Sequence, residues 1–307
     1  MSLLCGLTFA STSVDVPGSA RPADPTGPVR HADGTALRRP LPFFYDLYTF
    51  RGRNGRTTIV TSYAVEARHL ETETVDRRVR YRFSVTLVLA DAARRSVSGA
   101  HDTVYVDVPR ALSSDHLLYT HVEVLAPPSV TTQQRVIMTD ATTPGIGQMY
   151  SEYYPIPDYS GPELMLSDIA LGKPEEKEEN GWRRGDVTLA LLPTSQLPSS
   201  AFDVFYEIYN LPAGHTYTTE IAIEDVGRPG RASEPVRLRF AGESGAGPDA
   251  VLPELRRVET SLPRGSYRLT VTITDLTSGA TASRSRTFDV RGRDRRTTMV
   301  AALPDRR

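Results

Sequence analysis

The sequence lacks several features that would assign it to a familiar class. A single cysteine, Cys5, excludes an intramolecular disulfide and a cluster of thiolate metal ligands. No run approaches the roughly 20 consecutive apolar residues that a membrane-spanning helix needs. Lys and Arg number 36 against 37 Asp and Glu, so the basic excess of a general nucleic-acid binder is missing. We therefore expect no nucleic-acid partner.

Patterns of catalysis are missing as well. No Gly-x-Ser-x-Gly elbow is present. His116 and His121 have an odd spacing, which puts them on opposite faces of a strand and disfavours a shared metal. Glu220 and Glu224 lie on one face of a predicted strand, where a solvated surface pair is the simpler interpretation than a glycoside-cleaving pair. We expect no catalytic residue, no cofactor, no metal site and no enzymatic activity.

The chain is rich in alternation of apolar and polar residues. In 79–89 the odd positions are apolar and the even positions from Arg80 to Thr86 are polar, and 267–274 alternates in the same way. Asn54-Gly55 is a hairpin signal. One buried and one solvated face is typical of antiparallel sheets packed as sandwiches. The predicted fold is all-β: two antiparallel β-sandwich domains, immunoglobulin-like or fibronectin-like, in tandem behind an extended N-terminal arm.

Composition predicts the domain boundaries. The charged run 173–180 marks the division, and 252–262 is the best candidate for a short helix or irregular crossover. Thr-Asp pairs that end at Asp140 and Asp275 suggest that the two domains are copies. The predicted segments are a Pro/Gly-rich arm (1–42), a first sandwich (43–163), a linker (164–185), a second sandwich (186–291) and a basic tail (292–307).

Three phrases carry a family resemblance: LMLSDIALG (164–172), FDVFYEIYNL (202–211) and the alternating stretch 262–290. Over roughly 43–291 the chain resembles the C-terminal tandem β-sandwich region of bacterial GWxTD-domain proteins. The GWxTD module itself is absent, because Gly181-Trp182 is followed by Arg184-Gly185 in place of Thr-Asp. The resemblance implies the fold and a periplasmic location in a Gram-negative cell, and it transfers no catalytic residue.

Two groups of residues are candidates for an interface. Tyrosines beside prolines suit protein contacts, because the ring gives rigid apolar area with a polar tip; the alternative is that these rings cover the sandwich edge and the domain junction. Clustered arginines suit acidic protein surfaces or lipid head groups, or they keep strand edges from pairing. The candidates are Tyr150, Tyr153, Tyr154, Tyr159, Arg51, Arg53 and Arg56.

The N-terminal stretch MSLLCGLTFAS is open to three interpretations. It is a frayed tail, the remnant of a longer signal sequence with a misplaced start, or a short membrane-touching anchor. Cys5 is a weak candidate for lipidation, because Leu4 occupies the place where lipoprotein signals have a small residue.

These expectations combine into a functional prediction. We expect a non-enzymatic, extracytoplasmic accessory subunit, peripheral to a membrane, that docks onto protein subunits of a larger membrane-bound assembly through its sandwich surfaces and arm. One concrete version is an extrinsic periplasmic subunit of a photosynthetic reaction-centre and light-harvesting complex. The alternatives are a carbohydrate-binding or carbohydrate-active sandwich, and a periplasmic chaperone-like module that offers an unprotected sheet edge to client strands.

Overall fold

The computed structural model describes residues 14–15, 38–93, 95–174, 181–197, 201–227, 234–245, 250–259, 262–290 and 297–299. Within these ranges the chain forms strands and two three-residue 3-10 helices, Ala67–His69 and Thr194–Gln196. The all-β prediction is confirmed. Cys5 and most of the arm and tail lie outside the described residues.

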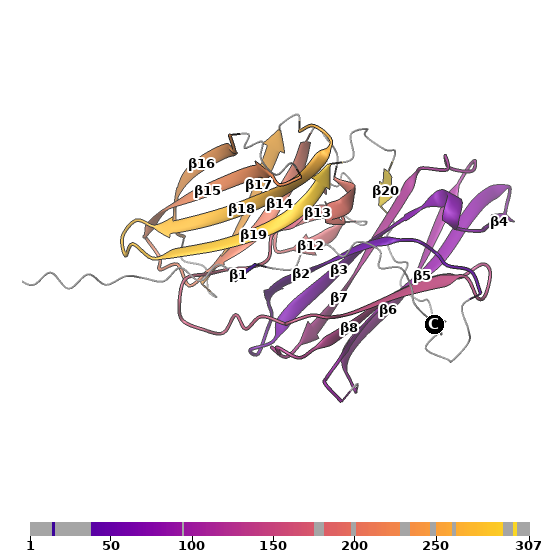
Figure 1. Cartoon of the computed structure of the whole chain (residues 1–307), viewed down its shortest axis with the longest axis horizontal. Coiled ribbons are helices and arrows are strands. Elements are labelled where there is room, and N and C mark those ends of the chain that lie inside the picture. Colours follow the sequence, from indigo (N-terminus) through magenta and orange to yellow (C-terminus); the bar gives the residue numbers. More distant parts are fainter. Residues whose placement is uncertain are drawn as a thin grey trace, which may run out of the picture.

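The first unit consists of two antiparallel sheets (Figure 1). The strands of one sheet are β2 (Phe44–Arg51), β3 (Thr57–Glu66) and β7 (Leu117–Ala126), with β20 (Thr297–Met299) added in parallel beside β7. The other sheet contains β4 (Thr72–Val75), β5 (Arg78–Ala90), β6 (Ser96–Val108), β8 (Gln133–Asp140) and β9 (Gly147–Tyr153).

The second unit repeats this plan with two further sheets. One sheet contains β10 (Met165–Leu166), β11 (Ala170–Pro174), β12 (Trp182–Arg184), β13 (Val187–Leu191), β14 (Ala201–Tyr209) and β17 (Val251–Glu259). The other contains β15 (Thr216–Asp225), β16 (Val236–Glu243), β18 (Gly265–Asp275), β19 (Thr281–Val290) and, parallel to β19, β1 (Val14–Asp15).

Two sequence predictions need correction here. The span 164–185, expected to be a linker, contributes β10, β11 and β12 to the second unit, and Ile169 and Leu171 are buried in its core. The stretch 252–262, expected to be a short helix or crossover, lies mostly in β17, which pairs along all nine residues of β14. The remaining part of the charged run, 175–180, lies outside the described residues.

The strand order is duplicated. The pairings β3–β7 and β6–β5–β8–β9 in the first unit match β14–β17 and β16–β15–β18–β19 in the second, as expected for two fibronectin-like sandwiches. Asp140 Oδ1 accepts the Thr142 N–H at 2.7 Å, and Asp275 Oδ1 accepts the Thr277 N–H at 2.9 Å. Each Asp therefore closes the turn after its strand in the same way.

Three apolar clusters hold the layers together. The first lies between the sheets of the first unit and the second mainly between the sheets of the second unit. The third joins the units, and its largest side chains are Tyr48 and Phe50 from β2 with Trp182 and Phe205 from the second unit. Consequently β3 is buried along its whole length, on both faces, whereas β5 keeps the predicted alternation.

Candidate functional site at the junction of the two units

The outer edge of β2 is closed by the second unit. Alternate residues of an edge strand turn their backbone N–H and C=O groups away from the neighbouring strand. In β2, Arg286 donates from Nη2 to the Leu47 carbonyl at 2.5 Å, and the Thr49 N–H donates to Asp168 Oδ2 at 3.0 Å. The Asp168 N–H donates in turn to the Thr49 carbonyl at 2.9 Å. An edge that could pair with a foreign strand is thus satisfied internally.

The end of β2 is closed in the same way. The Arg51 N–H donates to the Tyr209 hydroxyl at 2.8 Å, and Arg184 donates from Nη2 to the Arg51 carbonyl at 2.6 Å. Arg184 also pairs with Glu207 at 2.8 Å, and the Tyr209 hydroxyl donates to Glu207 Oε2 at 2.6 Å. The guanidinium of Arg184 stacks 5.3 Å from the Phe50 ring. This cluster ties the first unit to β12 and β14.

Four buried charges lie at this edge, Asp46 on β2 itself and Asp168, Arg284 and Arg286 on the second unit. Arg284 Nη2 is 2.7 Å from Asp168 Oδ1, and Arg286 Nη2 is 3.7 Å from Asp46 Oδ1. The four side chains are at most 8% exposed. Asp46 also accepts the N–H and hydroxyl of Thr194 at 2.5 and 2.7 Å. The charges are paired, as buried charges must be.

The pKa values of this cluster follow from burial and pairing. Burial raises the pKa of Asp46, and the Arg286 guanidinium and the Thr194 hydrogen bonds offset part of that rise. Burial works to lower the pKa of Arg284, but the Asp168 carboxylate together with Tyr159 and Tyr154 outweighs it, so that the pKa lies above its usual value. The pKa of Arg286 is raised against burial in the same way, by Asp46 first and by Tyr48, Asp168 and Tyr154 after it. Both arginines therefore remain charged inside the junction.

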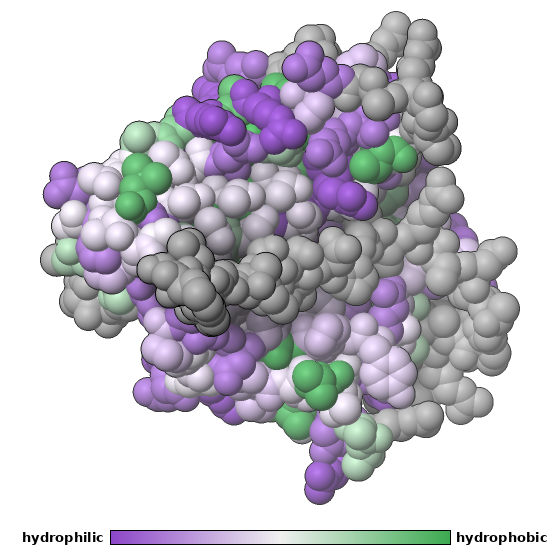
Figure 2. Space-filling view, turned by 60° about the vertical axis from the view of Figure 1, so that its left-hand side comes forward, coloured by the Kyte–Doolittle hydropathy of each residue, from purple (hydrophilic) through white to green (hydrophobic). Residues whose placement is uncertain are grey.

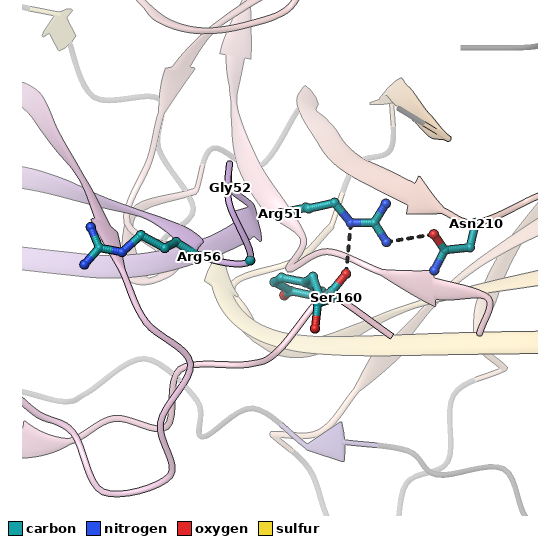
Figure 3. A pocket seen from close by; sticks show the side chains of 7 residues that line it. Arg51, Gly52, Arg56, Ser160 and Asn210 are labelled. Atoms are coloured by element: carbon teal, nitrogen blue, oxygen red, sulfur yellow. Dashed lines mark hydrogen bonds between the residues drawn. The ribbon is translucent and has the colours of Figure 1, made fainter. Parts of the chain in front are cut away.

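A shallow recess opens at the surface next to this junction (Figure 3). Its volume is about 240 Å³. Arg51 is held there by hydrogen bonds from Nε to the Tyr159 carbonyl and from Nη2 to Asn210 Oδ1, each 2.9 Å, and it stacks 4.3 Å from the Tyr209 ring. Arg56 points away from Arg51 in Figure 3. The recess is lined by Arg51, Gly52, Gly55, Arg56, Tyr159, Ser160 and Asn210.

The predicted interface tyrosines are mostly interior residues. Tyr150 is 8% exposed and packs against Phe43 at 5.0 Å, and Tyr154 packs against the same core. Tyr159 is buried, and its hydroxyl lies 2.8 Å from the Thr49 hydroxyl. Tyr153 alone among these four tyrosines is open to solvent, at 76% exposure. The alternative, that the rings cover the sandwich edge and the domain junction, therefore fits the burial of Tyr150, Tyr154 and Tyr159, and Tyr153 is the one of the four that a partner could reach in this structure.

The predicted arginines divide in a similar way. Arg51 is partly buried and forms part of the junction, whereas Arg53 and Arg56 are exposed in the hairpin between β2 and β3. Asn54 and Gly55 in that hairpin both have positive φ, as the Asn-Gly signal predicted. The structure thus brings Arg51, Arg56 and Tyr159 together at one recess, and it places Tyr153 elsewhere.

The buried charge cluster was not predicted from the sequence. Arg284 and Arg286 occupy the same alternate, inward-facing positions of β19 as Phe288 and Val290, so two basic residues at core positions were the signal that could have revealed it. The partner Asp168 lies in a stretch that we expected to be linker. Glu220, one of the two glutamates weighed above as a glycoside-cleaving pair, forms ion pairs with Arg237 and Arg239, each at 2.6 Å.

Two absences within the described residues bear on the site. No group of three or more His, Cys, Asp or Glu side chains there could hold a metal ion. In the same part of the chain, no helix has the length and apolar character to cross a membrane.

Comparison with known proteins adds little. No family model and no curated protein matches the chain. The crystal structure of red sea bream transglutaminase is 11% identical with a TM-score of 0.25, over 81% of this chain and 31% of that chain. That of Bacteroides uniformis β-glucuronidase is 10% identical with a TM-score of 0.26, over 75% and 26%. Since this chain spans less than a third of their lengths, neither activity is assigned to it. The GWxTD resemblance stays a prediction.

Proposed function

We propose that this chain is a non-enzymatic accessory subunit that docks as one piece onto a larger, membrane-bound, extracytoplasmic assembly. The observation that supports this proposal is the junction. Removing one partner of a buried ion pair typically costs about 3–5 kcal/mol. Here the Arg286–Asp46 pair joins the two units, and Asp168, which is paired with Arg284 within the second unit, accepts the Thr49 N–H of the first. A sealed strand edge and an aromatic cluster fix the same two sandwiches against each other. A fixed relation between two sandwiches is useful to a protein that presents surfaces to several neighbours.

The surface itself favours contacts made through edges and charges. The face shown in Figure 2 has small, separate hydrophobic patches among hydrophilic side chains. Large contiguous apolar patches mark hydrophobic docking sites, and this face has none among its described residues. In the proposal, the arm (1–42) runs along the partner and the first sandwich makes the main contact.

Mild detergent extraction of the native membrane tests this function. A tagged chain is purified, sized and analysed by mass spectrometry together with the proteins that travel with it. We expect stoichiometric co-migration with integral membrane subunits; photosynthetic membranes are one preparation to screen. Migration at the mass of one chain would contradict the proposal. Loss of the arm by limited proteolysis without loss of the complex would remove the role of the arm alone.

A further inference from the structure

The edges of the four sheets are treated differently. The β2 edge is closed by side chains of the second unit, β7 is covered by β20, and β19 is paired with β1. By contrast β16, eight residues long, pairs on one side with β15, and none of the described residues pairs with its other side. It lies at the outer edge of its sheet in Figure 1. An exposed edge of this length is a template for another strand.

The register shows which backbone groups of β16 face outward. Ser244 donates its N–H to the His215 carbonyl, so the even-numbered residues turn toward β15. The odd-numbered residues Arg237, Arg239 and Ala241 therefore present their N–H and C=O groups to the outside. None of them is proline, so three donors and three acceptors stand in a row.

Neighbouring edges are less suited to pairing. On β17 the Asn210 N–H donates to the Ala250 carbonyl, which turns even-numbered residues toward β14 and leaves Pro253 at an outward position without an N–H. On β6, the Asp107 carbonyl already accepts the Arg78 side chain at 2.8 Å. Of these three described edges, that of β16 has the uninterrupted row.

The side chains of β16 show what would pair there. On the outer face, Arg237 and Arg239 share the single carboxylate of Glu220, and their side chains are 52% and 77% exposed. Two guanidinium groups on one carboxylate leave a local excess of one positive charge at this end of the strand, while Glu243 carries a negative charge at its other end. On the inner face, Leu238 and Phe240 are only partly buried at the rim of the second core, where Arg256 stacks 5.0 Å from the Phe240 ring.

We propose that the free edge of β16 receives an extended segment of a partner protein whose residues alternate between acidic and apolar. The backbone of that segment would add a strand to the sheet, about 4.8 Å from β16. Its carboxylates would stand opposite Arg237 and Arg239, where opposite charges stabilise a cross-strand pair. Its apolar residues would cover Leu238 and Phe240. This inference rests on the proposed docking function and names the edge that performs it.

A peptide titration tests the inference without the native partner. The probe is a fluorescent, end-capped ten-residue peptide of alternating Glu and Val, measured by anisotropy against the full chain. The test variant is Ala241→Pro, which removes an outward N–H and leaves the ladder to β15 intact; the matched control is Ala241→Ser, which keeps that N–H. We expect about tenfold weaker binding for the proline variant, since one lost hydrogen bond and the bulk of the ring add together, and little change for serine.

Charge reversal gives a second readout. The variant with both Arg237→Glu and Arg239→Glu should lose the Glu/Val peptide and gain a Lys/Val peptide of the same length. A peptide N-methylated along its pairing side should not bind the wild type, whatever the folding of the variants. Absence of saturable binding to the wild type, or equal binding by the proline and serine variants with unchanged thermal unfolding, would overturn the inference.

The two proposals fail separately. If the proline variant still co-migrates fully with the membrane assembly, the docking function stands and the β16 edge is not its site. If the wild type does not co-migrate with any assembly, the docking function fails, and the peptide titration alone decides whether β16 accepts strands. The chaperone-like alternative predicted an unprotected edge strand, and β16 has that feature; broad binding of unrelated extended peptides would favour that alternative over a docking edge specific for acidic segments and would overturn the inference.

Discussion

Replacing Asp168 by Asn probes the junction most directly. Its carboxylate accepts the Thr49 N–H and hydroxyl and faces the Arg284 guanidinium, and it is 2% exposed. Asn keeps the shape but leaves Arg284 charged and without its counter-ion in a buried site. Loss of one partner of a buried pair costs about 3–5 kcal/mol. With an m-value of about 2–3 kcal/mol/M, this moves the urea midpoint down by about 1–2 M.

An exposed pair supplies the control. Asp107 and Arg80 form an ion pair 2.7 Å long whose side chains are 39% and 28% exposed. Asp107→Asn should barely move the urea midpoint, because exposed pairs contribute little. Unfolding is followed by far-ultraviolet circular dichroism and by Trp182 fluorescence, since Trp182 lies in the cluster between the units. Equal losses in the two variants would refute the assignment of the junction as the energetic link.

Other predictions concern single sites. Gly172→Ala should destabilise by about 1–3 kcal/mol in urea unfolding, because a Cβ there would lie 2.5 Å from the Ala190 carbonyl oxygen, whereas Gly245→Ala, which meets nothing within 4 Å, should not. Burial lowers the pKa of His121 from 6.5 to about 4. As the pH falls, the unfolded chain therefore takes up a proton before the folded chain does, and the free energy of unfolding decreases between pH 6.5 and pH 4 by about 3 kcal/mol in all. A His121→Gln variant should lose this part of the pH dependence in unfolding curves. Tyr267→Phe should cost about 1 kcal/mol in the same assay, because its hydroxyl donates to a carbonyl four residues upstream at 2.7 Å; an unchanged midpoint would contradict that role.

The fold was predictable wherever one face of a strand meets water. In β5 and β18, polar residues at alternate positions revealed both the strand and its inward face, and the burial of Tyr81, Phe83, Leu269 and Val271 confirms it. In β3 buried and exposed residues do not alternate, because the face of the strand that the sequence assigned to solvent packs against the second unit. Local periodicity reports one neighbouring layer, and it carries no information about a second.

The errors have equally local causes. Pro253 with Glu254, Arg256 and Arg257 obscured β17, although proline is at home on an outer strand position. The strands β10 to β12 are two to five residues long, too short for any period to register. At the site, the tyrosines were interpreted by residue type, and residue type alone does not distinguish an interface from a core. The buried arginines were predictable, because Arg284 and Arg286 occupy the same alternate positions of β19 as the apolar residues that face the core.

The charges at the junction have a role that apolar residues of the same volume could not take over. Replacing a buried ion pair by well-packed apolar side chains is often neutral or stabilising, so stability by itself does not explain Asp168 and Arg286. Both also satisfy the outward backbone groups of β2, at Thr49 and at Leu47. A leucine or methionine there would leave a buried N–H or C=O without a partner, at a cost of about 1–3 kcal/mol each. Two charges that are each held in a buried ion pair, Asp168 with Arg284 and Arg286 with Asp46, therefore also close an edge strand. The edge of β16 lacks such closure by any described residue, which is why we propose it as a place where a partner strand pairs.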